Sequence, residues 1–497
     1  MTPTDPQDRQ TALATSSAWP DVEGLSVTVV GLGKSGVAAA NALARRGARV
    51  LCIDDKPEHE LSDALGRLLP DVQAHCGASG PLGRRGDLFV LSPGIMPHSR
   101  RFRDIQGMAT AVLSEIELFY RLDRGHRHGL GHPIVAISGT DGKTTTTLWT
   151  AHLLRQAGRQ VVVGGNIGDP LCDFLDTMGA DDIVVAEVSA FQLYTCSAFR
   201  PRAAVVTNIA ADHLDWFAGD MASYVRTKAK VGDAMGAGDT LFLNGDDPEL
   251  ATERARLQAG VPHAWANFTV RGLPHCGFGF DGTTLQWCLA PGAQVPLVDQ
   301  SELGSLGAHP IEGIHNVENA LGASALALSL ATPLTAVRAG LRSFSLPSHR
   351  LEPVGSIGRV RFVDDSKATN PHAAIAGLQA IRIGEGERLV WIGGGSEKDA
   401  DFAELAEVVG GRAASVILLG QTAERIAAVL PRGLDTHRVA RLEDAVPLGL
   451  QLAGDAGVVL LSPACASFDM FRGYAHRGEV FATAVKRLQQ AIGTAAV

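Results

Sequence analysis

The chain has 497 residues, of which 45% are hydrophobic and 20% charged, and its 44 Lys and Arg against 53 Asp and Glu give a net charge of −9. This composition is that of a folded protein and excludes a chain that is disordered throughout. The acidic balance, without a dense basic run, argues against nucleic acid as a partner. The seven cysteines form no CxxC pair, so they predict neither a disulfide framework nor a zinc site and fit a cytoplasmic protein.

The first 24 residues are polar and lack both the cationic start and the apolar stretch of a signal peptide. We therefore expect a disordered extension over residues 1–24. No run of about 18 apolar residues occurs anywhere, so no membrane partner is expected.

Apolar runs rich in Val, Ile and Leu alternate with helix-like runs along the rest of the chain, as in VTVVG followed by KSGVAAANALARRG. Such alternation is typical of parallel sheets built from βαβ units, so the predicted fold class is α/β. At roughly 100–200 residues per domain we expect three domains. We place a Rossmann-like domain at 25–113, a central domain with a mostly parallel sheet at 114–346, and a Rossmann-like domain at 347–497. Short glycine-rich strands between about 262 and 312 predict a hairpin or meander appended to the central domain.

The first predicted domain carries a GxGxxG pattern at Gly31, Gly33 and Gly36, directly after a strand, and Asp54 and Asp55 end the next strand. Taken alone, the pattern is a dinucleotide fingerprint. The same loop can cradle any diphosphate, and nothing downstream resembles a hydride-transfer site. A nicotinamide-dependent oxidoreductase and a protein that binds a diphosphate-containing substrate are therefore both open at this point.

The strongest chemical signal is SGTDGKTTTT, residues 138–147, between the strand-like IVAIS and a helix. Glycines let backbone N–H groups turn toward one point, the following helix N-terminus favours anions, a lysine reaches the terminal phosphates and a Thr hydroxyl can ligand magnesium. The segment predicts a site for ATP, with a glycine-rich turn and an incidental lysine as the weaker alternative. Its residues are Gly139, Thr140, Asp141, Gly142, Lys143, Thr144 and Thr145.

Glu187 follows the apolar run DIVVA and so is expected at the carboxyl end of a strand, where ligands gather in open α/β sheets. Magnesium prefers oxygen ligands and retains several waters, so a hydroxyl such as that of Thr144 together with Glu187 would form a plausible site. A lone glutamate after a strand can equally be a surface or capping residue.

Three later segments also end predicted strands: RFVDDSKATN, WIGGGSEKDADF and LLSPACASFDMF. They should meet at one edge of a parallel sheet. Their lysines, hydroxyls and backbone N–H groups could bind carboxylates. Each lysine taken alone is more commonly a solvated surface residue.

The phosphate loop has Ile137 where the usual pattern has glycine, which shortens it to GxxGKT. In this the chain resembles the Mur ligases and folylpolyglutamate synthases. DDSKATNP and LSPACASFDMF are similar to the Mur ligase branch that adds D-glutamate, and the resemblance runs from about Leu25 onward. It implies a ligase of cytoplasmic peptidoglycan precursor synthesis, and a monomer is the default expectation. Its implied substrates are ATP, UDP-N-acetylmuramoyl-L-alanine and D-glutamate, and its implied intermediate is an acyl phosphate.

The resemblance also implies roles for individual residues. It implies two Mg²⁺ ions, held by Thr144, Glu187, His213 and Lys228, with Lys228 carbamylated by carbon dioxide, and it makes Lys143, His213 and Lys228 catalytic. Nucleotide contacts are implied for Asn316, Asn319, Arg350 and Asp365, although the two asparagines could instead cap a helix. Contacts to the UDP-linked substrate are implied for Gly33, Lys34, Ser35, Asp54, Asp55, Ser92, Pro93, Gly94, Asn166, Ser189 and Gln192. Contacts to D-glutamate are implied for Lys367, Thr369, Lys398, Ser467, Phe468 and Tyr474.

Three other functions are open. Folylpolyglutamate synthase, another acyl-phosphate ligase, is disfavoured by the GLGKSG segment and by the strand-end segments of the third domain. An oxidoreductase leaves SGTDGKTT unexplained. A regulatory nucleotide-binding module without catalysis would release no phosphate when both substrates are supplied.

Overall fold

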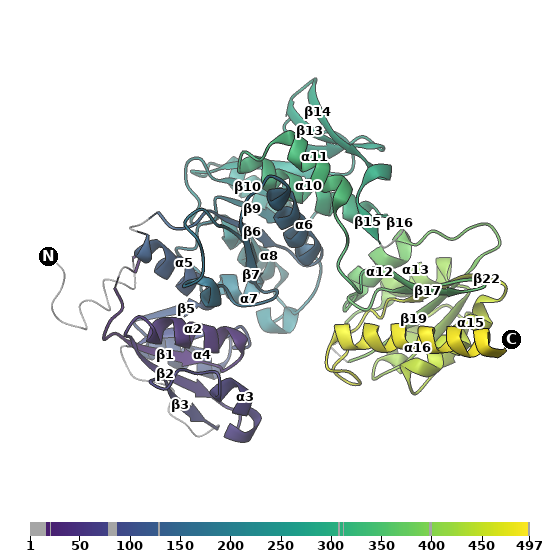
Figure 1. Ribbon diagram of the computed structural model, residues 1–497, viewed down its shortest axis with the longest axis horizontal. Helices are drawn as coiled ribbons and strands as arrows, with labels where there is room; N and C mark the ends of the chain where they lie inside the picture. The colour runs from purple at the N-terminus through teal and green to yellow at the C-terminus, as the bar shows by residue number, and fades with distance from the viewer. Residues whose placement is uncertain are drawn as a thin grey trace. The chain divides into compact units, whose positions relative to one another are not determined.

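The computed structural model describes residues 16–19, 21–77, 87–127, 130–306, 309–311, 313–396 and 400–495. It forms two compact units, the first made of residues 1–297 with 318–340 and the second of residues 298–317 with 341–497. Both are built from sheets and helices in alternation (Figure 1), which confirms the predicted α/β class. Among the described helices, none combines the length and the apolar character that crossing a membrane requires.

The N-terminal sheet of the first unit has five parallel strands in the order β3-β2-β1-β4-β5. Alternate residues of β1, β2 and β4 face opposite sides of the sheet, and both sides are apolar and buried, as expected for a parallel sheet with helices on both faces. The strands are β1 Ser26–Val30, β2 Arg49–Asp54, β3 Gln73–Cys76, β4 Leu88–Leu91 and β5 Ala111–Ser114, and the helices are α2 Lys34–Ala44, α3 Ser62–Leu65, α4 Arg100–Met108 and α5 Glu115–His126, with the short η1 Glu58–Glu60.

The second sheet of this unit has nine strands in the order β14-β13-β12-β11-β10-β9-β6-β8-β7, and β6 to β11 run parallel to their neighbours. The strands are β6 Ile134–Ser138, β7 Val161–Gly165, β8 Ile183–Glu187, β9 Ala203–Val206, β10 Thr240–Asn244, β11 Ala264–Thr269, β12 Gly277–Phe280, β13 Thr284–Ala290 and β14 Ala293–Asp299. The helical segments are α6 Lys143–Gln156, η2 Leu171–Phe174, α7 Ala190–Tyr194, η3 Leu214–Phe217, α8 Met221–Ala229, η4 Lys230–Gly232 and α9 Ala251–Gln258. The helices α10 Ile314–Ser329 and α11 Leu334–Ser343 span residues of both units, and η5 Gln300–Glu302 belongs to the second.

The glycine-rich stretch after β11 is strand-rich, as predicted. β12 and β13 pair antiparallel, and the strands extend the central sheet at its edge (Figure 1) and do not form a sheet of their own. A two-stranded ladder, β15 Ser305–Leu306 with β16 His309–Pro310, follows.

The sheet of the second unit has the order β17-β18-β22-β19-β20-β21, in which only the pair β17 and β18 is antiparallel. Alternation along β19 shows why helices cover both faces: Leu389 and Trp391 pack with α12 and α13, while Val390 and Ile392 pack with α15 and α16. The strands are β17 Glu352–Ile357, β18 Arg359–Asp364, β19 Arg388–Gly393, β20 Ser415–Leu418, β21 Asp435–Arg438 and β22 Ala456–Leu461, and the helices are α12 Pro371–Ala380, α13 Ala403–Arg412, α14 Ala423–Val429, α15 Leu442–Ala453 and α16 Tyr474–Ala495.

The prediction of disorder over residues 1–24 is wrong for residues 16–19 and 21–24; residues 1–15 and 20 lie outside the described residues. Trp19 and Val22 are buried, and the Trp19 amide donates to the Arg121 carbonyl at 2.8 Å. Arg121 in turn donates to the Ser16 carbonyl and stacks on the Trp19 ring. The polar N-terminal segment is therefore packed through the buried side chains of Trp19 and Val22, and it contacts α5 through Arg121.

The first two predicted domains share one hydrophobic core in the structure, which runs from α2 through α5 to the central strands. A buried ion pair lies at this junction: Arg121 donates to Glu117, and Glu117 accepts the backbone N–H groups of Ala198 and Phe199 at 2.8 and 2.7 Å. Removing one partner of such a pair leaves an uncompensated buried charge, at a cost of about 3–5 kcal/mol. The boundaries near 113 and 346 stay predictions.

Candidate active site

The phosphate loop lies between β6 and α6, as predicted from the sequence. Gly142 is the N-cap of α6 with a φ of 75°, a left-handed conformation that favours glycine. A side chain at Gly139 would collide with the Thr207 hydroxyl, and one at Gly142 would collide with the Asn319 amide. Both glycines are therefore required by close approach as well as by backbone conformation.

The tip of the loop is held by the segment that follows β9. The Asn208 side chain accepts from the Asp141 N–H at 2.8 Å and donates back to the Asp141 carbonyl at 3.2 Å. The Thr207 hydroxyl donates to the same carbonyl at 2.6 Å, and the Thr140 N–H donates to the Asn208 carbonyl. These contacts hold the loop with its shape already formed, which lowers the ordering cost of binding a ligand there.

Glu187 lies at the end of β8 and is buried, with both carboxylate oxygens used. Oε2 accepts from the Thr144 hydroxyl at 2.8 Å and Oε1 accepts from the Asn166 amide at 2.9 Å. The structure thus brings together three residues predicted from separate motifs. A hydroxyl beside a carboxylate at the start of a helix is an oxygen donor set that fits Mg²⁺.

Lys143 and Lys228 both donate to backbone carbonyls of the phosphate loop. The Lys143 ammonium donates to the Thr140 carbonyl at 2.6 Å, and the Lys228 ammonium donates to the Gly139 carbonyl at 2.5 Å. Lys228 is 3% exposed and lies over the ring of Tyr224, whose hydroxyl is 3.2 Å from that of Thr140. Burial, followed by the nearby Lys143 ammonium, lowers the pKa of Lys228 well below its usual range.

His213 begins the turn η3 with a φ of 54°, and its ring packs edge-on against Phe191. Asp212 lies 3.6 Å from His213 Nε2. Ser189 and Gln192 form a capping box at the start of α7, so these two side chains support the helix that carries Phe191.

Asn319 accepts a hydrogen bond from Thr146 of α6, whereas Asn316 is buried near the start of α10.

The glycine loop of the N-terminal sheet surrounds Gly31, whose carbonyl accepts from the Ser92 hydroxyl at 3.0 Å. The two acidic residues differ: Asp54 accepts from the N–H groups of Leu32 and Lys56, while Asp55 is exposed and pairs with Arg101. Asp54 therefore holds the loop itself. The predicted residues that lie on this loop, at the start of α2 or in the turn after β4 are Gly33, Lys34, Ser35, Ser92, Pro93 and Gly94.

In the second unit, the loops after β18, β19 and β22 follow adjacent strands, so their predicted residues share one sheet edge. The Lys367 ammonium lies 4.1 Å from the centre of the Tyr474 ring. Ser467 is buried while Phe468 is 74% exposed, and Thr369 is half-buried. Lys398 lies outside the described residues.

Asp365 is buried at the start of the loop after β18, where its carboxyl accepts from the Ser462 hydroxyl at 2.6 Å. Burial raises the pKa of Asp365 to about 7, against the effect of the Ser462 hydrogen bond and of Arg350. The carboxyl therefore titrates near neutral pH in this structure.

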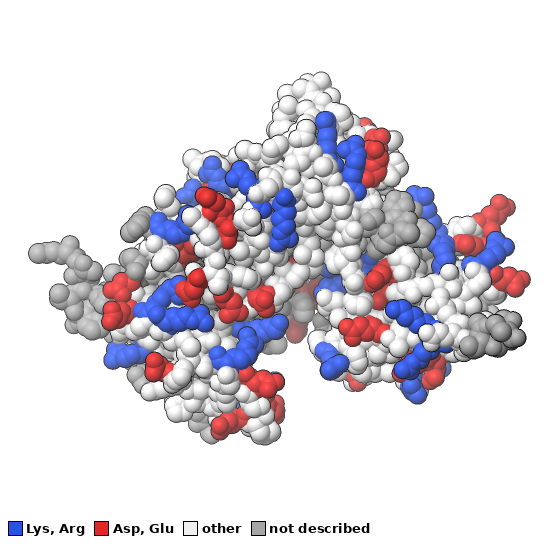
Figure 2. All heavy atoms as spheres, in the orientation of Figure 1, with Lys and Arg blue, Asp and Glu red and all other residues white. Residues whose placement is uncertain are grey.

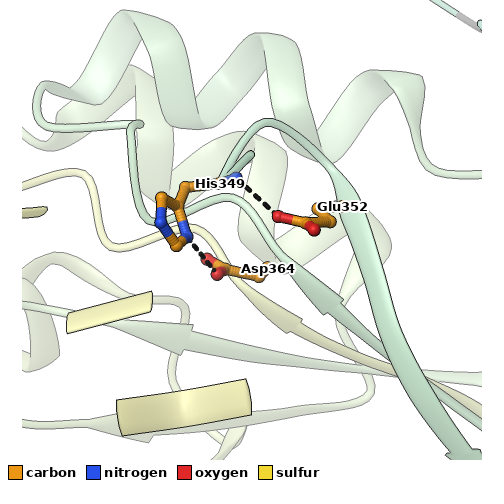
Figure 3. Close-up of side chains that lie close together, drawn as sticks. All are labelled: His349, Glu352 and Asp364. Atoms are coloured by element: carbon orange, nitrogen blue, oxygen red, sulfur yellow. Dashed lines mark hydrogen bonds and ion pairs between the residues drawn. The ribbon is translucent and has the colours of Figure 1, made fainter. Parts of the chain in front are cut away.

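The turn before Arg350 is braced by two carboxylates (Figure 3). His349 Nδ1 lies 2.7 Å from Asp364, and the His349 N–H donates to Glu352 at 2.8 Å. The hydrogen bond with Asp364 raises the pKa of His349. His349 and Leu351 adopt positive φ values of 66° and 51°, and the Leu351 N–H donates to Asp365 at 3.3 Å. The three side chains support the turn that presents Arg350.

Charge is mixed on the face seen in Figure 2, where Lys and Arg alternate with Asp and Glu over both units.

Sequence reasoning did not assign roles to Thr207, Asn208 or Arg477. Asn208 could have been found from its place directly after an apolar strand. Arg477 carries no such signal, because an arginine in a helix is ordinarily a surface residue.

Comparison with known proteins gives three matches to family domains along the chain. Residues 25–114 match the Mur ligase MurD-like N-terminal domain, residues 137–266 the Mur ligase middle domain, and residues 349–465 the Mur ligase glutamate ligase domain.

Similar proteins cover nearly the whole chain. The UDP-N-acetylmuramoylalanine--D-glutamate ligase of Pelotomaculum thermopropionicum is 38% identical over 93% of this chain and 98% of its own, and that of Geotalea daltonii is 37% identical over 94% and 98%. The MurF ligase of Thermotoga maritima, solved in complex with ADP, has a similar fold, with a TM-score of 0.56 and 18% identity over 82% of this chain and 96% of its own. The chain belongs to the Mur ligase family.

Proposed function

We propose that the chain is an ATP-dependent ligase that joins D-glutamate to UDP-N-acetylmuramoyl-L-alanine in cytoplasmic peptidoglycan precursor synthesis. Relatives of 35–38% identity carry that activity in their names and match the chain over nearly its full length. The observation that carries the proposal is the phosphate loop held ready between β6 and α6, with Glu187 and two lysines directed at it. We also propose that the chain acts as a monomer.

A carboxylate is a poor acyl donor, so amide formation in water needs a better leaving group than oxide. In the proposed reaction the substrate carboxylate attacks the γ-phosphorus of ATP, an O–P bond forms, the bond to the β-phosphate bridging oxygen breaks, and ADP leaves. Lys143 and the N–H groups at the start of α6 are suited to stabilise charge on the transferring phosphoryl group. The product is an acyl phosphate.

The neutral amine of D-glutamate then attacks the acyl carbon, a C–N bond forms, the C–O bond to phosphate breaks and one proton is released. We propose that Lys367, Thr369, Lys398 and Ser467 bind the two carboxylates of this amino acid, because charged and neutral hydrogen-bond donors are what such a ligand requires. Phe468 and Tyr474 would flank it, and Asp365, Arg350, Asn316 and Asn319 would contact the nucleotide.

For the UDP-linked substrate we propose the glycine loop of the N-terminal sheet, with Lys34, Ser35, Ser92 and the exposed Asp55. Asp54 would act indirectly, since two backbone N–H groups already occupy its carboxylate. Asn166, Ser189 and Gln192 would contact the muramoyl part.

We propose two Mg²⁺ ions near the loop: the oxygens of Thr144 and Glu187 would hold one, and the His213 imidazole with a carbamate on Lys228 would hold the other. Bound there, the ions would neutralise charge on the phosphates. A lysine ammonium cannot ligand a cation, whereas its carbamate can. The burial of Lys228 supports this proposal because it favours the neutral amine, the form that attacks carbon dioxide, and a proton is released as the C–N bond forms.

The amine specificity is tested by measuring phosphate release with ATP, Mg²⁺ and UDP-N-acetylmuramoyl-L-alanine while offering D-glutamate, L-glutamate, L-alanine or diaminopimelate. We expect release only with D-glutamate, and a loss of about 100-fold or more in Lys143→Ala because a charge-stabilising group is removed. The exposed Lys486→Ala is the matched control and should be unaffected. Release with a different amine would overturn the proposed substrate.

The hydrogen bonds of Thr207 and Asn208 with the Asp141 backbone form a clamp on the phosphate loop. We expect nucleotide binding to weaken when this clamp is broken. We expect Asn208→Ala and Thr207→Val each to raise the Kd for ADP by about tenfold, since each removes hydrogen bonds that hold Asp141 in place. Thr207→Ser keeps the hydroxyl and should bind as the unmodified chain does. Calorimetric titration measures the Kd values, and tight binding by both disrupted variants would refute the role of the clamp.

The carbamate is tested by NMR of the protein in ¹³C-bicarbonate. We expect a carbamate carbonyl signal that disappears in Lys228→Ala, with loss of ligase activity. Lys230→Ala is the control, because the Lys230 ammonium donates to the Tyr194 carbonyl, away from the loop. An identical spectrum in Lys228→Ala would show that the lysine is not modified.

A further inference from the structure

A buried arginine lies beneath the loops at the carboxyl edge of the C-terminal sheet. Arg477 is in the first turn of α16 and is 1% exposed. Its guanidinium donates to Ser366 twice, through Nε to the hydroxyl at 2.9 Å and through Nη2 to the carbonyl at 2.8 Å. Nη1 donates to the carbonyls of Cys465 and Ala466 at 3.0 and 3.3 Å. All four acceptors are neutral oxygens of two loops.

These two loops carry most of the residues proposed to bind the amino acid. Ser366 directly precedes Lys367, and Ala466 directly precedes Ser467 and Phe468. The Ser366 hydroxyl also donates to the Tyr474 carbonyl at 2.8 Å. One planar cation thus fixes the spacing between the loop after β18 and the loop after β22.

A third loop is attached to the same point. The Ser396 N–H donates to the Ala466 carbonyl at 2.8 Å, so Ser396 and Arg477 share that acceptor. A side chain at Gly395 would collide with the Ala466 carbonyl and lie 3.2 Å from Arg477 Nη1. Since β18, β22 and β19 are adjacent, the three strand-end loops converge on this arginine.

The physical chemistry of the site explains what the arginine contributes. Moving a guanidinium out of water costs several kcal/mol, and four loop oxygens with fixed fork geometry offset that cost. Burial lowers the pKa of Arg477 to about 10, so it stays protonated at neutral pH. A positive charge that is screened little by water then lies beneath the loops.

We propose that Arg477 is the positioning residue of the amino-acid pocket. It holds the loops of Lys367 and Ser467 at the separation that a dicarboxylate amino acid requires. Its buried charge also adds positive electrostatic potential to the pocket, although the side chain does not touch the substrate. This inference rests on the proposed function and deepens it, because it assigns the shape of the pocket to a residue outside the pocket.

The test measures the KM for D-glutamate, kcat, and the Kd for ADP in Arg477→Met, Arg477→Lys and Ser366→Ala. Arg487→Met, on the exposed side of the same helix, is the matched control. For Arg477→Met we expect the KM for D-glutamate to rise by about tenfold or more. Arg477→Lys keeps the positive charge but loses the planar set of guanidinium donors, so the KM for D-glutamate should rise less than in Arg477→Met. Ser366→Ala should raise this KM by about threefold. The Kd for ADP should stay within about twofold of the unmodified chain in all three variants. A general loss of stability would not change the KM for D-glutamate while leaving the Kd for ADP unchanged.

An unchanged KM for D-glutamate in Arg477→Met and Ser366→Ala, with normal ADP binding, would overturn the inference. So would a parallel loss of ADP binding in all three variants, which would indicate a purely structural role. If Arg477→Met does not fold, Arg477→Lys and Ser366→Ala decide by the same criteria. An unmodified chain that shows no turnover dependent on D-glutamate would instead contradict the proposed function, and with it the pocket assigned to Arg477.

Discussion

Parallel strand pairing is the constraint on which the rest of the structure depends. Neighbouring strands that run in the same direction end at the same edge of their sheet, so the loops that follow them meet there. In the first unit this brings Glu187 after β8, Asn208 after β9 and the phosphate loop after β6 into contact. In the second it joins the loops after β18, β19 and β22. Within each unit, residues far apart in sequence therefore come together at one sheet edge.

Within each unit, the loops at the sheet edge are held by backbone groups more than by paired charges. The phosphate loop is fixed through the Asp141 backbone, and the strand-end loops of the second unit through carbonyls of Ser366, Cys465 and Ala466. Backbone contacts define position without neutralising the charged side chains that must face a ligand. The Lys143 ammonium donates to the Thr140 carbonyl, and the Lys367 ammonium lies over the Tyr474 ring, so a polar or aromatic neighbour positions each side chain.

Much of this could be predicted from sequence because the signals are local. Buried parallel strands are continuous apolar runs, and the phosphate loop is a contiguous segment with a known physical role, so fold class and loop were recognisable. The side chains that hold the loops were not, since Arg477 and Thr207 act through contacts formed only in the folded chain. The N-terminal segment was mispredicted for a related reason. Its polar composition predicts disorder, but the Trp19 side chain is buried in the folded chain.

In the reaction we propose, the carboxylate of the UDP-linked substrate is activated by direct transfer of the γ-phosphoryl group of ATP. Both oxygens of that carboxylate can be labelled with ¹⁸O and the released phosphate analysed by mass spectrometry after a single round of ligation with D-glutamate. We expect one ¹⁸O atom in each phosphate, carried over when the C–O bond of the acyl phosphate breaks. Phosphate without label would contradict it, because the oxygen would then have come from water.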